Sequence, residues 1–230
     1  MLMRTPIIEK WWPTTQSLDL IRGSIKKVGS AIQQELCRVL KDEPIQDKWI
    51  EFRNLNQAFG MIKEYTNYPT AFILLPTYSD WCVLWNNSFL CDGYDSLCFN
   101  LTRLYGFETI HWVSHDLKTT FLPGTAFSHR ILVNQKLKTR SVYCAQDNQR
   151  WIFYQIGKPL AAEKTALYSA RIIRNRLNER IFTDMLLRLG AEPWNEQFYN
   201  LNRKKSLLLK RLKVPSTIKK KSAKSLLWAT

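Results

Sequence analysis

The chain has 230 residues, of which 45% are hydrophobic and 13% aromatic, and its formal net charge is +15. This apolar content is ample for a packed core and excludes wholesale disorder, and no apolar run approaches the roughly 18 residues of a membrane span. The five cysteines are odd in number and lack C-x-x-C spacing, so they do not indicate a disulfide framework. Together with the absence of a signal-peptide pattern at the start of the chain, they predict a cytoplasmic protein with free thiols.

Residues 1–66 are predicted to form a helical hairpin. After a candidate N-cap at Ser17, apolar residues recur at steps of three and four as far as Val39, which is typical of one helix face. The stretch Asp47–Tyr65 has the same periodicity. Pro44 separates the two predicted helices, because the residue before a proline avoids the α conformation.

Residues 67–199 are predicted to form an α+β body around a mostly antiparallel sheet. Short apolar or β-branched runs bounded by turn residues indicate strands. These runs are Ala71–Leu75, Trp81–Trp85, Glu108–Val113, Thr119–Val133, Arg140–Ala145 and Arg150–Ile156.

Two helices are predicted within this body. A short inserted helix covers Ser96–Tyr105, with Asp95 as its cap and Gly106 just beyond its end. A long helix is predicted over Ala161–Leu189, because apolar residues recur there at helical spacing until Gly190.

Residues 200–230 are predicted to be a basic tail, either partly disordered or an amphipathic helix. Between Arg203 and Lys224 there are ten basic residues and no acidic one, so like-charge repulsion opposes compaction. Binding to a polyanion would release counterions and favour such a cluster. The leucines among the charges would also suit a peripheral contact with an anionic membrane or a partner protein. A disordered, solubilising end is the alternative.

The predicted nucleic-acid-binding residues are cations of this tail and of the predicted long helix. Arginines on that helix could follow a phosphate backbone, although the interspersed Glu163, Glu179 and Asp184 are typical of a solvated surface. The predicted set is Arg171, Arg174, Arg203, Lys204, Lys205, Lys210, Arg211, Lys213, Lys219, Lys220, Lys221 and Lys224.

Two stretches could carry metal or acid–base chemistry. His111 and His115 would share a face on a helix, but their surroundings favour a strand, where four residues span roughly 13 Å. Asp92 and Asp95 could pair as catalytic or metal-binding carboxylates, with Cys91 as a nucleophile. A turn at Asp92 and a helix cap at Asp95 also account for both acids. No catalytic residue, metal site or cofactor is therefore predicted.

Other catalytic patterns are absent from the sequence. Ser128 and His129 are neighbours on a predicted strand, so they point to opposite faces and cannot act as a nucleophile and its base. Neither a G-x-S-x-G elbow nor a G-x-x-x-x-G-K-[ST] loop is present.

These observations favour a non-enzymatic basic binding protein. The expected partner is nucleic acid, preferably single-stranded because bases can stack on aromatic side chains, or an acidic nucleoprotein. A bacterial or phage accessory or interference factor would fit this description. Two alternatives stay open: an immunity-type inhibitor of one acidic protein, whose approach the positive charge would steer, and a metal-dependent nuclease or other hydrolase.

Overall fold

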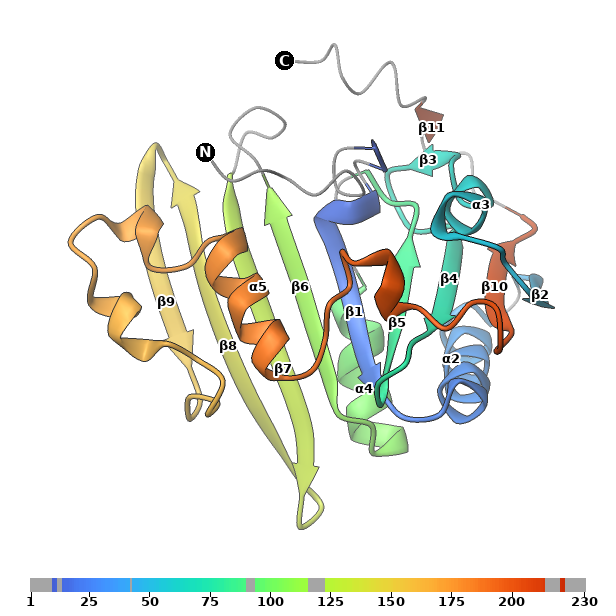
Figure 1. The fold of residues 1–230 in the computed structure, drawn as a ribbon, viewed down its shortest axis with the longest axis horizontal. Helices are drawn as coiled ribbons and strands as arrows, with labels where there is room; N and C mark the ends of the chain where they lie inside the picture. The colour runs from blue at the N-terminus through green and yellow to red at the C-terminus, as the bar shows by residue number, and fades with distance from the viewer. Residues whose placement is uncertain are drawn as a thin grey trace.

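A nine-stranded sheet organises the molecule. The computed structural model describes residues 10–11, 14–41, 43–89, 94–115, 123–213 and 220–221. The strand order is β2-β10-β4-β5-β1-β6-β7-β8-β9, and all neighbouring strands pair antiparallel (Figure 1). The strands are β1 (Ser17–Arg22), β2 (Ile45–Ile50), β4 (Ala71–Pro76), β5 (Trp81–Asn86), β6 (Thr109–His115), β7 (Gly124–Val133), β8 (Lys136–Asp147), β9 (Arg150–Ile156) and β10 (Ser206–Arg211). A separate antiparallel pair joins β3 (Tyr65–Thr66) to β11 (Lys220–Lys221).

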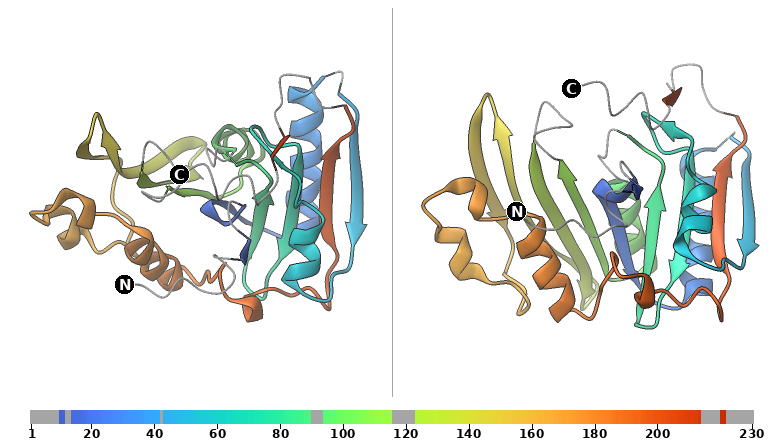
Figure 2. Two further views of the ribbon diagram at one scale, coloured as in Figure 1. Left: turned by 90° about the horizontal axis from the view of Figure 1, so that it is seen from above. Right: turned by 45° about the horizontal axis from the view of Figure 1, so that its top comes forward.

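Helices cover both faces of this sheet (Figure 2). One face carries α2 (Ile25–Val39) and α4 (Asp95–Tyr105), and the other carries α3 (Leu55–Gly60) and α5 (Glu179–Arg188). The described residues also form short 3-10 helices, which are η1 (Thr14–Gln16), η2 (Thr165–Ser169), η3 (Ile173–Asn175) and η4 (Glu196–Phe198). No helix within the described ranges is long and apolar enough to cross a lipid bilayer.

Each face of the sheet has its own apolar core. On the α2–α4 side, Ile32 and Leu36 of α2 pack with Leu97 and Leu101 of α4 over the central strands. The larger core on the other side includes Phe182 of α5, whose ring stacks on Trp112 with centroids 5.3 Å apart. Every residue of β4 and β5 is buried, because both faces of these strands are covered. Strands in this position consist of nearly continuous apolar runs.

The predicted helical hairpin over residues 1–66 is wrong. Residues 17–22 form the central strand β1, in which Leu18 and Leu20 enter one core and Ile21 enters the other. Gly23 then adopts φ +151°, in the region that favours glycine, and the helix begins only at Ile25. The four-residue step from Ile21 to Ile25 therefore joins a strand to a helix.

The predicted second helix, Asp47–Tyr65, is also wrong, since this segment contains β2, α3 and β3. Trp49 packs on the α2 side of the sheet, whereas Phe52 and Phe59 belong to the core on the other side. The Asn54 side chain caps the new helix by accepting a 2.9 Å hydrogen bond from the Gln57 N–H. The apolar residues at helical spacing thus serve two elements on opposite faces.

The long helix predicted over Ala161–Leu189 is replaced by η2, η3 and the ten-residue α5. A buried ion pair explains the interruption, because Glu163 is drawn to Arg140 of β8 with an Nη2–Oε2 distance of 2.7 Å. Tyr168 donates a second 2.7 Å hydrogen bond to the same carboxylate. Asn178 accepts from the Ile181 N–H at 3.1 Å and starts a new helix.

The segment predicted as a basic tail contributes a strand to the sheet. Residues 206–211 form β10 between β2 and β4, and Leu207, Leu208 and Leu209 are buried there. The nine-stranded sheet therefore contains strands from all three predicted regions of the chain, and the basic residues before β10 are held at a fixed place on the molecule.

Candidate anion-binding groove at the amino end of helix α2

The amino end of α2 lies where β1 turns into the helix. The Gly23 N–H donates a 2.8 Å hydrogen bond to the Asp80 carbonyl, which ties this turn to the loop before β5. Ser24 is the N-cap residue, but within the described part of the chain its side chain makes no capping hydrogen bond, and the first turn of α2 holds no acidic residue. The positive end of the helix dipole is therefore not offset by a side chain of the helix itself.

A groove beside this helix end brings together cations from distant parts of the sequence. We call it the Trp49 groove, and its volume is about 760 Å³. It is lined by Ser24, Ile25, Lys26, Ser30, Trp49, Arg203, Lys204 and Lys205. A shallower depression of about 400 Å³ continues past Lys26 and Ser30 toward Tyr105 and Phe107.

The cations of the Trp49 groove are free of acidic partners among the described residues. Lys26, Arg203, Lys204 and Lys205 are all exposed, and none takes part in an ion pair within the described ranges. Four unpaired positive charges around one depression attract anions and repel other cations. The groove is consequently suited to a ligand with several negative charges.

Trp49 provides the apolar wall of this groove. Its indole packs on α2 at Gly29, where a built Cβ atom would lie 2.9 Å from the ring carbon Cη2. The same Cβ would lie 3.1 Å from Leu207 of β10. The ring is only partly buried, so the indole combines a packed side with a surface that a ligand can touch.

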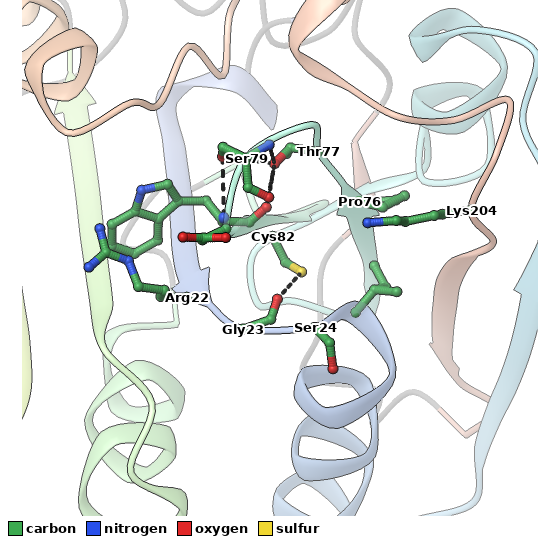
Figure 3. Close-up of a pocket in the computed structure, with 11 residues that line it drawn as sticks. Arg22, Gly23, Ser24, Pro76, Thr77, Ser79, Cys82 and Lys204 are labelled. Carbon is green, nitrogen blue, oxygen red and sulfur yellow. Dashed lines mark hydrogen bonds between the residues drawn. The ribbon is translucent and has the colours of Figure 1, made fainter.

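A second, smaller pocket opens next to the groove and shares Ser24, Ile25 and Lys204 with it. We call it the Cys82 pocket, and its volume is about 360 Å³. In Figure 3, Arg22 and Lys204 lie at opposite sides of this pocket, with the Cys82 side chain between them. Its other lining residues are Gly23, Pro76, Thr77, Ser79, Asp80 and Trp81.

Cys82 is not a nucleophile in this pocket. Its thiol donates a 3.3 Å hydrogen bond to the Gly23 carbonyl. Burial raises the pKa of Cys82 to about 12, against a weaker lowering effect of the Lys204 charge. The thiol is therefore protonated at neutral pH, whereas nucleophilic attack requires the thiolate.

Arg22 is held in place by a network at the end of β1. Its guanidinium lies 4.5 Å from the centre of the Trp81 ring and donates a 2.7 Å hydrogen bond to Glu108. His129 contacts the other carboxylate oxygen of Glu108 at 2.8 Å. Burial raises the pKa of Glu108, but the hydrogen bonds and charges of His129 and Arg22 outweigh it and lower the pKa overall. This carboxylate is therefore ionised and fixes Arg22 at the pocket.

The predicted nucleic-acid-binding residues are divided among several places. Arg203, Lys204 and Lys205 line the Trp49 groove. Arg171 and Arg174 are exposed near η3, which packs on β9 at the opposite end of the sheet from β10 and β2 (Figure 1). The structure therefore does not bring these two arginines to the groove.

The other described cations of the predicted tail do not line the Trp49 groove. Arg211 donates a 2.6 Å hydrogen bond from Nε to Glu43, and Lys220 contacts Glu64 at 2.8 Å. Lys210 is partly buried in β10, Lys213 is exposed after it, and Lys221 belongs to β11. Lys219 and Lys224 lie outside the described residues.

Two of the candidate catalytic residues, His111 and Asp95, are engaged in structural contacts. His111 lies in strand β6 and donates from Nδ1 to Asp19 at 2.6 Å. Arg130 donates two 2.7 Å hydrogen bonds to Asp95. His115 is partly exposed, but its Nδ1 atom is buried with no partner among the described residues, and burial lowers its pKa.

The structure offers no metal site in the ranges it covers. Cys91 and Asp92 lie outside the described residues. Among the residues that the structure describes, no group of three or more His, Cys, Asp or Glu side chains could hold a metal ion.

Sequence reasoning missed three residues that matter here. Lys26 and Trp49 line the groove, and Asp19 is the buried partner of His111. The position of Asp19 between Leu18 and Leu20 was a usable signal, because a carboxylate within an apolar run must find a partner if it is buried. The sequence around Lys26 and Trp49 does not indicate a role in the groove, because only the folded sheet brings them close to Arg203.

Comparison with known proteins gives no family for this chain: no family model matches it, and neither a curated protein nor a solved structure matches it. Function is therefore inferred from the geometry of the groove.

Proposed function

We propose that the protein is a non-enzymatic binding protein for single-stranded nucleic acid, and that the strand lies in the Trp49 groove. The observation that carries the proposal is the placement of Lys26, Arg203, Lys204 and Lys205 around one aromatic ring, with no acidic partner among the described residues. Phosphates would pair with the cations and with the positive end of α2. A base would stack on the indole of Trp49.

The aromatic wall favours nucleic acid over an acidic protein as the partner. An acidic protein surface would be attracted by the cations, but it has no particular need for an indole between them. A single strand presents phosphates and unstacked bases in alternation, and stacking on aromatic side chains contributes about 1–3 kcal/mol per base. The shallow depression toward Tyr105 and Phe107 offers the strand a continuation past Lys26.

A cytoplasmic location is part of this proposal. The four described cysteines, Cys37, Cys82, Cys98 and Cys144, are free. Free thiols suit a reducing compartment, in which nucleic acid is also accessible.

Fluorescence anisotropy with a labelled single strand tests the proposal. The triple variant Arg203→Ala, Lys204→Ala, Lys205→Ala is expected to bind about tenfold or more weakly at low salt, because three phosphate contacts are lost. Trp49→Ala is expected to weaken binding by about 1–3 kcal/mol. The matched control Arg171→Ala, Arg174→Ala, at the far end of the sheet, should bind like the wild type.

Equal affinity of the triple variant and the wild type would contradict the proposal. An acidic protein partner would be favoured instead if one protein co-purifies with the wild type after nuclease treatment and is lost with the triple variant. Circular dichroism of each variant should show that the fold is retained.

A further inference from the structure

The Cys82 pocket differs from the groove beside it in one respect that bears on the identity of the ligand. Its lining includes a carboxylate, Asp80, together with the cations Arg22 and Lys204. The Asp80 side chain is exposed and takes part in no hydrogen bond or ion pair within the described ranges, although its backbone carbonyl accepts from Gly23 at 2.8 Å. An unpaired carboxylate among cations is available to a ligand.

We infer that the Cys82 pocket receives one base of the bound strand, and that Asp80 favours guanine over thymine. This inference rests on the proposed function, since it requires a single strand in the Trp49 groove. The two sites share Ser24, Ile25 and Lys204, so one ligand can occupy both.

The size of the pocket limits what can enter it. Its volume of about 360 Å³ lies near the lower end of the range of small-molecule sites, which is roughly 300–1,000 Å³. One base with part of its sugar fits such a volume, whereas a continuing strand does not. The neighbouring groove, at about 760 Å³, is the place for the backbone.

The charge of Asp80 decides which part of a nucleotide enters. A carboxylate accepts hydrogen bonds and cannot donate them when ionised. It therefore repels a phosphate group and attracts N–H donors. The phosphates stay with Lys204 and the other cations of the groove, and the base points toward Asp80.

The groups around Asp80 match the pairing edge of guanine. Guanine presents two adjacent donors, N1–H and the N2 amino group, beside the O6 acceptor. A carboxylate can accept from both donors, as it accepts from the amino group of cytosine in base readout. Arg22 can donate to O6, and its guanidinium is already fixed by Glu108 and Trp81. Thymine instead offers a single donor, N3–H, between two carbonyl oxygens that the carboxylate would repel.

The side chains of three other lining residues, Thr77, Ser79 and Cys82, do not compete for the base. Thr77 and Ser79 are hydrogen-bonded to each other at 3.0 Å, and Thr77 also donates to the Trp81 carbonyl. The Cys82 thiol is occupied by the Gly23 carbonyl. Asp80 and Arg22 are therefore the groups that we expect to read the base.

The test compares three labelled strands on the full-length protein by fluorescence anisotropy. The reference is an all-thymine oligonucleotide of about 15 nucleotides, long enough to fill the groove. The other two carry one central guanine or one central inosine, which lacks the N2 amino group. We expect the guanine strand to bind about tenfold more tightly than the thymine strand, with inosine between them.

The Asp80→Asn variant then identifies the reading group. We expect it to bind the all-thymine strand as well as or better than the wild type, because a negative charge is removed, and to lose the preference for guanine. The control Asp147→Asn, in the β8–β9 hairpin, removes an equal charge away from the pocket and should keep that preference.

The outcomes separate this inference from the proposed function. If the wild type binds all three strands equally, or if Asp80→Asn keeps the guanine preference, the inference is wrong while strand binding in the groove stands. If no strand binds, or if the triple variant of Arg203, Lys204 and Lys205 binds like the wild type, the proposed function fails and this inference fails with it.

Discussion

The indole of Trp49 packs so closely on Gly29 that a methyl group at position 29 would come within 2.9 Å of the ring carbon Cη2. This contact joins the edge strand β2 to helix α2, and it sets the position of the aromatic wall of the Trp49 groove. Glycine is unfavourable inside a helix by about 1 kcal/mol relative to alanine. The close packing of the indole gives a physical reason for a glycine at this position.

Gly29→Ala is therefore expected to destabilise the protein although it favours the helix. Overpacking costs roughly 1–3 kcal/mol, which exceeds the gain of about 1 kcal/mol in helix propensity. The free energy of unfolding in urea should fall by up to about 2 kcal/mol, and the oligonucleotide affinity should fall because Trp49 is displaced. Gly60→Ala is the matched control, since no atom lies within 4 Å of a Cβ atom built there. A stabilised Gly29→Ala protein with normal affinity would contradict this view of the groove.

The Asp19–His111 pair predicts a pH dependence of stability. Both side chains are buried, and the Nδ1–Oδ1 distance is 2.6 Å. Burial lowers the pKa of His111, but the hydrogen bond and charge of Asp19 outweigh it, so the pKa is raised overall. The pairing then contributes its full stability below the unfolded-state pKa of about 6.5 and loses it as the pH rises through the folded-state value. In urea unfolding, the free energy of unfolding of the wild type should exceed that of His111→Gln by the largest amount at low pH.

His115 provides a control of opposite sign. Burial alone lowers its pKa, so the folded state binds a proton less readily than the unfolded state and loses stability as the pH falls below about 6.5. His115→Gln should therefore gain stability relative to the wild type at low pH. The same pH trend for both variants would contradict the assignment of His111 as the charged partner of Asp19.

The Arg140–Glu163 pair predicts a large stability effect without an effect on binding. The side chains are 3% and 0% exposed, and Arg140 also donates to Gln155 and to two backbone carbonyls. Glu163→Gln leaves the arginine charge buried without its counterion, which costs about 3–5 kcal/mol. Urea unfolding measures the loss, and the oligonucleotide affinity of the folded variant should be unchanged.

An exposed ion pair serves as the comparison for this prediction. Lys164 and Asp184 are 53% and 40% exposed, with Nζ 3.3 Å from Oδ2. Asp184→Asn should cost less than about 1 kcal/mol, because exposed pairs contribute little. If Glu163→Gln and Asp184→Asn lose similar amounts of stability, the buried Arg140–Glu163 pair does not stabilise the segment after β9 more than an exposed pair does.

The sequence indicates the strands between residues 71 and 156 well, but it does not indicate the central strand β1 or the true bounds of most helices. Strands occur where the runs Trp81–Trp85 and Arg150–Ile156 predict them, because short apolar or alternating runs between turn residues have few other solutions. The helical spacing of residues 161–189 is overridden by tertiary contacts of Glu163 with Arg140. Spacing alone could not reveal this, since Arg140 lies 23 residues earlier in the chain.

The candidate site could be predicted only in part. The charge of Arg203–Lys205 is visible in the sequence, but its neighbours Lys26 and Trp49 come from segments more than 150 residues away. They meet because β10 inserts between β2 and β4. In the sequence, the leucines of β10 resemble the apolar face of an amphipathic tail. Their place in the sheet is not visible there, because strand pairing between distant segments leaves no local pattern.

The salt dependence of single-strand binding tests the central claim most directly. Each phosphate contact contributes about 0.7 to the slope of log Kobs against log salt concentration for a single strand. The triple variant of Arg203, Lys204 and Lys205 to alanine should therefore have a slope smaller by about 2 than the wild type, whereas the Arg171 and Arg174 double variant should keep the wild-type slope. An unchanged slope in the triple variant would contradict the claim that a strand lies in the Trp49 groove.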